Sequence, residues 1–144
     1  MQLTRYTDYS LRVLIYLALH DEYLVTTDEI AKDFRISRSH LVKVVRNLAA
    51  TGFITSVRGR NGGMQLALPA AEIVLGDVVR ASEENLDLVE CFDRERSQCR
   101  IDGACGLQRV LDDALRGFLS VLDRHTLADV TRRRSALISL LSAP

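Results

Sequence analysis

The first 50 residues repeat their apolar positions with the period of an α-helix. Four of these positions stand at i, i+3, i+4 and i+7, and they are Leu11, Leu14, Ile15 and Ala18. This pattern predicts a helix over residues 8–20 with one buried face. Thr26 and Glu29 have the spacing of a capping box, in which each side chain satisfies an N–H group at the helix start, so a second helix is expected over residues 26–34.

A tight turn separates the second helix from a third. Ile36 and Ser37 form the turn, and Ser37 is the candidate N-cap of a helix over residues 38–50. The apolar stripe of this third helix consists of Leu41, Val44, Val45 and Leu48. Gly52 follows, and glycine suits the left-handed position that commonly ends a helix. Two helices joined by such a turn predict a helix-turn-helix.

Two strand-like segments, residues 53–57 and 64–68, follow the third helix. The glycine-rich loop of residues 58–63 joins them, which predicts a β-hairpin, and Pro69 ends it. A helix-turn-helix followed by a hairpin has the order of a winged helix-turn-helix. We therefore expect a mainly α fold with a small β-hairpin wing.

The second half of the chain is dominated by one long amphipathic segment. A short helix is expected over residues 73–81, and a helix over residues 106–122 follows the polar, irregular residues 91–105. The apolar residues of the long helix step by 4, 3, 4 and 3, as at a coiled-coil interface, and they are Leu107, Leu111, Ala114, Phe118 and Val121. This spacing predicts a dimerisation helix. After Asp123 we expect one or two helical turns and then a frayed tail.

Charge is balanced over the chain but concentrated locally. The 144 residues include 19 basic and 19 acidic side chains, a net charge of zero. Residues 34–71 nevertheless contain no acidic residue and six basic ones, which are Arg35, Arg38, Lys43, Arg46, Arg58 and Arg60. Such a local basic surface is compatible with DNA binding, because the distribution of charge matters more than its sum. No apolar run reaches membrane-spanning length, so we expect a cytoplasmic protein without a membrane partner.

The third helix carries polar side chains opposite its apolar stripe. At about 100° per residue, Ser39, Lys43, Arg46 and Asn47 point away from the stripe, with His40 to the side. Hydroxyl, amide and cationic groups can read base edges and hold phosphates in a major groove. The plainer interpretation is a solvated helix face, which the preceding turn and the following hairpin disfavour.

The hairpin tip is the second candidate contact with DNA. Its arginines could enter a minor groove, where narrow A·T-rich segments concentrate negative potential. An ordinary solubilising turn is the alternative, and a nucleotide-binding loop is disfavoured because the P-loop lysine is missing. The complete set of candidate DNA-binding residues is Ser37, Arg38, Ser39, His40, Lys43, Arg46, Asn47, Arg58, Arg60 and Asn61.

Three cysteines lie in one polar segment. Cys91, Cys99 and Cys105 are the only cysteines, and seven and five residues separate them. Their sequence neighbours are charged, whereas structural cysteines usually have apolar neighbours. Thiolates in one loop favour a soft metal or an iron–sulfur cluster. Zinc, a thiol redox sensor and incidental cysteines are the alternatives, although these spacings do not resemble a zinc knuckle and no histidine is close in sequence.

Several segments resemble one family of regulators. Residues 1–12 (MQLTRYTDYSLR), 37–43 (SRSHLVK) and 57–63 (VRGRNGG), with three cysteines ahead of a long helix, are similar to the iron–sulfur winged-helix regulators over almost the whole chain. Within that family the nitric-oxide-sensing repressors are the most similar. The resemblance implies a homodimer with one cluster per subunit, expected as [4Fe–4S] with [2Fe–2S] as the alternative. It also implies Asp8 as a fourth, oxygen ligand supplied across the dimer, and Arg12 near the cluster.

The same resemblance implies a function that is not enzymatic. We expect a repressor of nitrosative-stress genes that binds a palindromic operator in double-stranded DNA and has nitric oxide as its signal. The cluster-biogenesis regulators of the family carry a histidine shortly after the third cysteine, whereas Gln108 stands three residues beyond Cys105 here. A biogenesis or general redox regulator of this family is the main alternative. A small electron carrier and a protein-binding winged helix with incidental cysteines are more distant ones.

The expected organisation has three parts. Residues 1–80 form the winged helix-turn-helix DNA-binding domain. Residues 81–105 form a connecting helix and the cluster-binding loop, and residues 106–144 form the dimerisation helix and the C-terminal tail.

Overall fold

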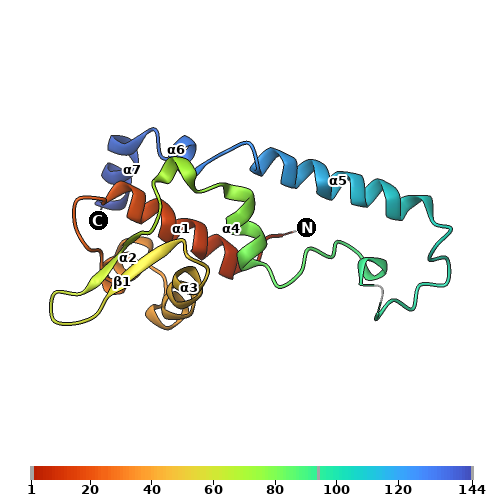
Figure 1. Cartoon of the computed structure of the whole chain (residues 1–144), viewed down its shortest axis with the longest axis horizontal. Helices are drawn as coiled ribbons and strands as arrows, with labels where there is room; N and C mark the ends of the chain where they lie inside the picture. Colours follow the sequence, from red (N-terminus) through yellow and green to blue (C-terminus); the bar gives the residue numbers. More distant parts are fainter. Residues whose placement is uncertain (1, 94, 144) are drawn as a thin grey trace.

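The computed structural model describes residues 2–93 and 95–143, and it has the predicted mainly α architecture with a small hairpin (Figure 1). The elements in chain order are α1 (Arg5–Leu19), α2 (Thr27–Phe34), α3 (Arg38–Ala50), β1 (Ile54–Val57), β2 (Gly63–Leu66), η1 (Ala70–Glu72), α4 (Leu75–Ser82), η2 (Glu90–Phe92), α5 (Gly106–Leu122), α6 (Leu127–Val130) and α7 (Arg134–Leu141). The two strands pair antiparallel, with Ile54 opposite Leu66. The predicted fold class is confirmed.

Helix α1 is the centre of the core. It packs against α3, α4, α6, α7 and β2. Its residues Val13, Leu14 and Leu17 are buried against the apolar stripe of α3, in which Leu41, Val44 and Leu48 are also buried. Helix α5 extends away from this body, as Figure 1 shows, and none of its residues is buried.

Local capping signals explain where some of the helices begin and end. The capping box of Thr26 and Glu29 is present, and Gly52 has the expected positive φ of 81°. Helix α1 begins at Arg5, three residues earlier than predicted, because the Thr4 side chain accepts a hydrogen bond from the Thr7 N–H. Ser37 is the N-cap of α3 by position only, since its hydroxyl lies 2.8 Å from the hydroxyl of Ser39 and makes no capping bond.

The expectation of a frayed tail is wrong. Leu127 of α6 is fully buried in the core, and Leu141 of α7 packs against it. The guanidinium of Arg134 donates to Asp21 at 2.8 Å, to Glu22 at 2.5 Å and to the Ala18 carbonyl at 3.1 Å. These contacts join residues more than 110 positions apart in the chain, which explains why local periodicity did not reveal them.

Arg35, in the turn between α2 and α3, has a backbone conformation that disfavours its own side chain. Its φ of 56° is the only positive φ of a non-glycine residue among the described positions. A side chain in this region costs about 1–2 kcal/mol, whereas glycine adopts it freely but loses more chain entropy on folding. Arg35→Gly is therefore expected to raise the free energy of unfolding by about 0.5–1 kcal/mol.

Chemical denaturation measures this effect, and Gly52→Ala is the matched control. Gly52 also has a positive φ, so a side chain there should lower stability by about 1 kcal/mol. An Arg35→Gly protein less stable than the unsubstituted protein would show that the arginine side chain contributes more than its backbone strain costs.

Candidate DNA-binding face and cysteine loop

The outward face of α3 carries cations next to an unexpected apolar side chain. Lys43 and Arg46 are exposed, as the helical wheel predicts, and Arg38 at the start of the helix is exposed as well. Arg38 pairs with Asp28 of α2 at 2.5 Å, so part of its charge is compensated within the protein. Val42 lies on the same outward face with 46% of its surface exposed. Sequence reasoning missed Val42 because only polar residues were considered as candidates.

Three other candidates on α3 make contacts inside the protein. The Asn47 amide is half-buried and donates to the carbonyl of Ala81 at 3.2 Å, which joins α3 to the end of α4. The prediction that Asn47 points toward DNA conflicts with this contact. The His40 ring stacks on Tyr9 of α1, with ring centroids 6.3 Å apart, and the Ser39 hydroxyl pairs with Ser37.

The wing places its candidate residues on an exposed tip. Arg58, Arg60 and Asn61 are all exposed on the loop between β1 and β2. Gly62 is required there, since a Cβ atom on it would collide with the Val57 carbonyl oxygen. The hairpin is held to the body near its tip, because the backbone of Met64, the second residue of β2, pairs with that of Val25. The wing is thus a short, anchored hairpin (Figure 1), and its two arginines are exposed to solvent.

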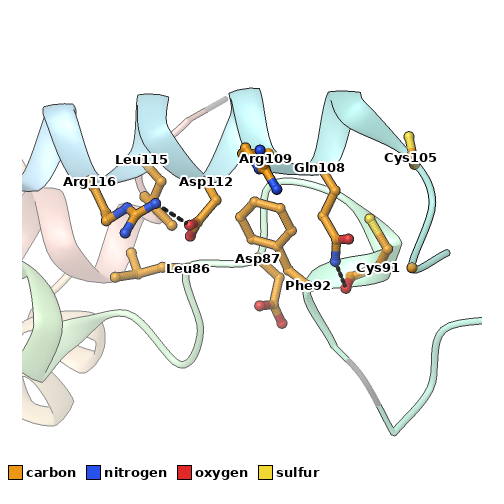
Figure 2. A pocket seen from close by; sticks show the side chains of 11 residues that line it. Leu86, Asp87, Cys91, Phe92, Cys105, Gln108, Arg109, Asp112, Leu115 and Arg116 are labelled. Carbon is orange, nitrogen blue, oxygen red and sulfur yellow. Dashed lines mark hydrogen bonds and ion pairs between the residues drawn. The ribbon is translucent and has the colours of Figure 1, made fainter.

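The cysteine loop lies at the far end of α5 from the winged-helix body. Cys91 belongs to η2, Cys105 is the N-cap of α5, and all three cysteines are half-exposed free thiols. Cys91 and Cys105 line a hollow of about 520 Å³ together with Phe92 and Gln108 (Figure 2). The Gln108 amide donates to the Cys91 carbonyl at 3.1 Å, which fixes the loop to α5.

The thiols are close enough to influence one another electrostatically. The pKa of the Cys91 thiol is raised, mainly because desolvation disfavours the thiolate; a backbone hydrogen bond opposes this effect, and the charges of Asp102, Cys99 and Cys105 add to it. A cationic metal centre would reverse this effect, because a coordinated thiol is deprotonated outright. A hydrogen bond of 2.6 Å from the Gln98 N–H to the Glu90 carboxylate brings the residues next to Cys99 and Cys91 together.

The chemistry of the three cysteines suits an iron–sulfur centre. Within residues 2–93 and 95–143, no three His, Cys, Asp or Glu side chains are arranged to hold one metal ion. Three soft sulfur ligands within 15 residues nevertheless suit iron–sulfur ligation by their chemistry. Cys91, Cys99 and Cys105 are therefore the residues that fit such a group.

Asp8 is not brought to the cysteines of its own chain. It lies in the first turn of α1, on the winged-helix body, whereas the cysteine loop lies at the opposite end of α5 (Figure 1). Its carboxylate pairs with Arg12, whose Nε lies 3.1 Å and whose Nη2 lies 2.8 Å from the two carboxylate oxygens. The Arg12 guanidinium in turn lies over the Phe34 ring at 5.8 Å.

These features define a class of protein: a winged-helix transcriptional regulator. Residues 3–133 match the model of the Rrf2 family, which is described as "Iron-dependent Transcriptional regulator", and the chain belongs to this family. None of the helices in the described part of the chain is long and apolar enough to cross a membrane.

Two curated relatives carry the same name, "HTH-type transcriptional regulator NsrR". The protein from Geobacillus kaustophilus is 51% identical over 142 residues, which cover 98% of this chain and 97% of the relative. The protein from Bacillus subtilis is 43% identical over 142 residues, again 98% and 97% of the two chains. The resemblance to regulators named NsrR is thus confirmed at the level of the sequence.

Two solved structures share the fold. "The Structure of CymR (YrzC) the Global Cysteine Regulator of B. subtilis" superimposes with a TM-score of 0.77 at 25% identity, covering 92% of this chain and 98% of the other. "T. potens IscR" superimposes with a TM-score of 0.74 at 25% identity, covering 92% and 88%. The helix-turn-helix and the hairpin are therefore those of a regulator fold.

Proposed function

We propose that this chain is a homodimeric transcriptional repressor that senses nitric oxide through an iron–sulfur cluster and controls nitrosative-stress genes. The observation that carries the proposal is the position of three half-exposed thiols at one end of a helix whose other end is fixed to a winged helix. The name NsrR, shared by relatives of 43–51% identity, supports nitric oxide as the signal. Cys91, Cys99 and Cys105 would hold the cluster, with [4Fe–4S] as its expected type.

Helix α5 is firmly joined to the DNA-binding body at its C-terminal end. Arg80 of α4 donates two hydrogen bonds of 2.7 Å to the two carboxylate oxygens of Asp123. Gly76 lies directly beneath, and a Cβ atom there would overlap the Asp123 carboxylate. A bidentate pair of this kind fixes direction as well as distance. A change in the direction of α5 would therefore be transmitted to α4 and, through the Asn47 contact, to α3.

Asp8 offers a second connection between the proposed cluster and the DNA-binding face. Two tyrosines on either side of Asp8 contact α3: the Tyr6 hydroxyl donates to the Lys43 carbonyl at 3.2 Å, and Tyr9 stacks on His40. Arg12 connects Asp8 to Phe34 at the end of α2. We propose that the Asp8 carboxylate of one subunit is the fourth ligand of the cluster held by the cysteine loop of its partner. Its carboxylate would then leave Arg12, and the contacts of α1 with α2 and α3 would change.

When bound, the cluster would supply iron that nitric oxide attacks, and a hard carboxylate among soft thiolates would be its weakest attachment. The remaining requirement is thermodynamic. A signal can shift DNA binding only as far as the two states differ in affinity, and a thousandfold loss needs about 4 kcal/mol.

The dimer would form through α5. The exposed stripe differs from the predicted one, because Leu111 and Phe118 are half-buried and line a hollow with residues of their own chain. The exposed positions step by 3, 4, 3 and 4 residues and are Leu107, Val110, Ala114, Gly117 and Val121. Leu107 and Val110 expose 59% and 62% of their surfaces, which is unusual for large apolar side chains in one stripe. The small residues Ala114 and Gly117 would permit a close approach of the partner's α5. Two winged helices related by a twofold axis then predict a palindrome with half-sites about 10–10.5 bp apart, or a multiple of that distance.

The main alternative is a regulator of cluster biogenesis or of general redox state. The structural similarity to an IscR protein favours it, because the two share the fold and 25% of their residues. Gln108 favours nitric oxide sensing, since its amide is bonded to the Cys91 carbonyl and it stands where the resemblance implies a histidine in the biogenesis regulators.

Selection of DNA sequences by the anaerobically purified protein tests the proposed function. A library of random duplexes should yield a palindromic sequence, and the protein should be coloured and contain iron. A protein that enriches no sequence over scrambled duplexes would refute DNA-binding regulation. A colourless, iron-free protein that still enriches a palindrome would refute the cluster alone.

The cations of α3 and the wing are expected to have different roles. Lys43 is a flexible point charge suited to phosphate, so Lys43→Ala should weaken binding to all duplexes similarly. It should also reduce the slope of log affinity against log salt concentration by about 1.

Arg60 at the wing tip is assigned to the minor groove, so Arg60→Ala should weaken binding most when the operator flanks are A·T-rich. Salt titrations on the selected and the scrambled duplex measure both effects. An equal decrease on A·T-rich and G·C-rich flanks would make Arg60 a nonspecific phosphate-binding residue.

A further inference from the structure

The side chain of Val42 is exposed on the outward face of α3, where core packing does not account for it. It exposes 46% of its surface, whereas Leu41 and Val44 beside it are buried. Valine forms helices less readily than alanine because its β-branch restricts the side chain. Neither helix formation nor core packing therefore explains a valine at this position.

The neighbours of Val42 are those of a DNA-contacting surface. At about 100° per residue, Arg46 lies about 40° and Ser39 about 60° from Val42 around the helix, and Lys43 is adjacent. Arg46 and Lys43 are exposed cations, and no acidic residue occurs anywhere in residues 34–71. An apolar group surrounded by cations suits a partner that is anionic at its edges and apolar at its centre.

Several polar groups of α3 are already used within the protein. The Ser39 hydroxyl pairs with Ser37 at 2.8 Å, the His40 ring stacks on Tyr9, and the Asn47 amide donates to Ala81. These interactions limit how many of the polar candidates can turn to base edges without giving up a partner. Val42 can contact a base without breaking a hydrogen bond, because an apolar side chain makes none.

We propose that Val42 determines sequence specificity by packing against the C5 methyl group of a thymine in the major groove. Thymine is the only base of unmodified DNA that presents a methyl group there, so an apolar side chain can distinguish it from the other three. This proposal rests on the proposed function as a DNA-binding regulator. In a symmetric dimer it requires one such thymine in each half-site, at equal distances from the centre of the palindrome.

Deoxyuridine substitution tests this packing, because it removes only the methyl group from a thymine. A duplex selected by the unsubstituted protein is remade with each symmetric pair of thymines replaced in turn. At one pair, the affinity should fall about fourfold for each methyl group removed, or about fifteenfold for both half-sites. The Val42→Ala protein should bind the unmodified duplex more weakly and should not distinguish thymine from deoxyuridine at that pair.

Two further variants serve as controls. Lys43→Ala should weaken binding to the thymine and deoxyuridine duplexes equally, because a phosphate contact does not depend on the methyl group. Val42→Thr keeps one methyl group and the shape of the side chain, so it should retain part of the discrimination. Circular dichroism should show unchanged folding, since Val42 is exposed.

The outcomes separate this proposal from the function on which it rests. The protein could select a palindrome and yet, at every thymine pair, lose no more affinity on replacement by deoxyuridine than the Val42→Ala protein loses. In that case Val42 does not read a methyl group, and the proposed function stands. If no sequence is selected at all, the proposed function and the role of Val42 both fail.

Discussion

Replacement of Cys91, Cys99 or Cys105 by alanine is expected to abolish iron binding. Each substitution removes one of only three thiols in the chain, and histidine is too distant in sequence to replace it. Iron content and visible absorbance of the anaerobic protein should fall to background. The fold should survive, because none of the cysteines belongs to the buried core.

The controls distinguish ligands from the other residues of the loop. Ser97→Ala alters a side chain that only accepts a hydrogen bond from the Cys99 N–H at 3.4 Å, so it should retain iron. Asp8→Ala should retain a labile cluster, because water or an added thiol can occupy the vacant position. Full iron content in any one cysteine variant would exclude that cysteine as a ligand.

Val110→Glu is expected to convert the dimer into monomers. Val110 is 62% exposed in the single chain, so the substitution should leave the protomer folded. Because of the twofold symmetry, each dimer would bury two unpaired carboxylates in the α5 interface. This should weaken association by more than about 3 kcal/mol, which is over a hundredfold in the dissociation constant. Sedimentation equilibrium measures it.

Val110 is a better probe of this interface than Phe118, which the sequence pattern places on the apolar stripe. Phe118 is half-buried and lines a hollow with Leu3 and Leu86 of its own chain, so a charge there would also disturb the protomer. Val110→Thr, with nearly the same shape and no charge, should remain dimeric as the control. A Val110→Glu protein that remains dimeric at the same concentrations would place the interface elsewhere.

The elements that depend on neighbouring residues were predictable from the sequence. Helix α5 has the predicted bounds, Gly106–Leu122, because its amphipathic repeat is long and uninterrupted. The capping box of Thr26 and Glu29 defined the start of α2 in the same way. Contacts between distant residues were not predictable: the Arg80–Asp123 pair joins residues 43 positions apart, and the Arg134 contacts join the two ends of the chain.

The candidate site shows the same division. A helical wheel identifies which side chains of α3 point outward, but it does not show that the Asn47 amide is bonded to Ala81 or that His40 stacks on Tyr9. The cysteines were found by composition and spacing alone. That Gln108 fastens their loop to α5 follows only from three-dimensional structure, since its hydrogen bond to Cys91 spans 17 residues.

Operator affinity before and after addition of nitric oxide tests the central claim most directly. The anaerobic, iron-containing protein is titrated with its selected palindromic duplex, then treated with nitric oxide and titrated again, with the Cys99→Ala protein carried through the same steps. We predict a large decrease in affinity, on the order of a thousandfold, in the unsubstituted protein, and weak binding that does not respond to nitric oxide in Cys99→Ala. Equal operator affinity before and after nitric oxide in the iron-containing protein would contradict the proposed sensing function.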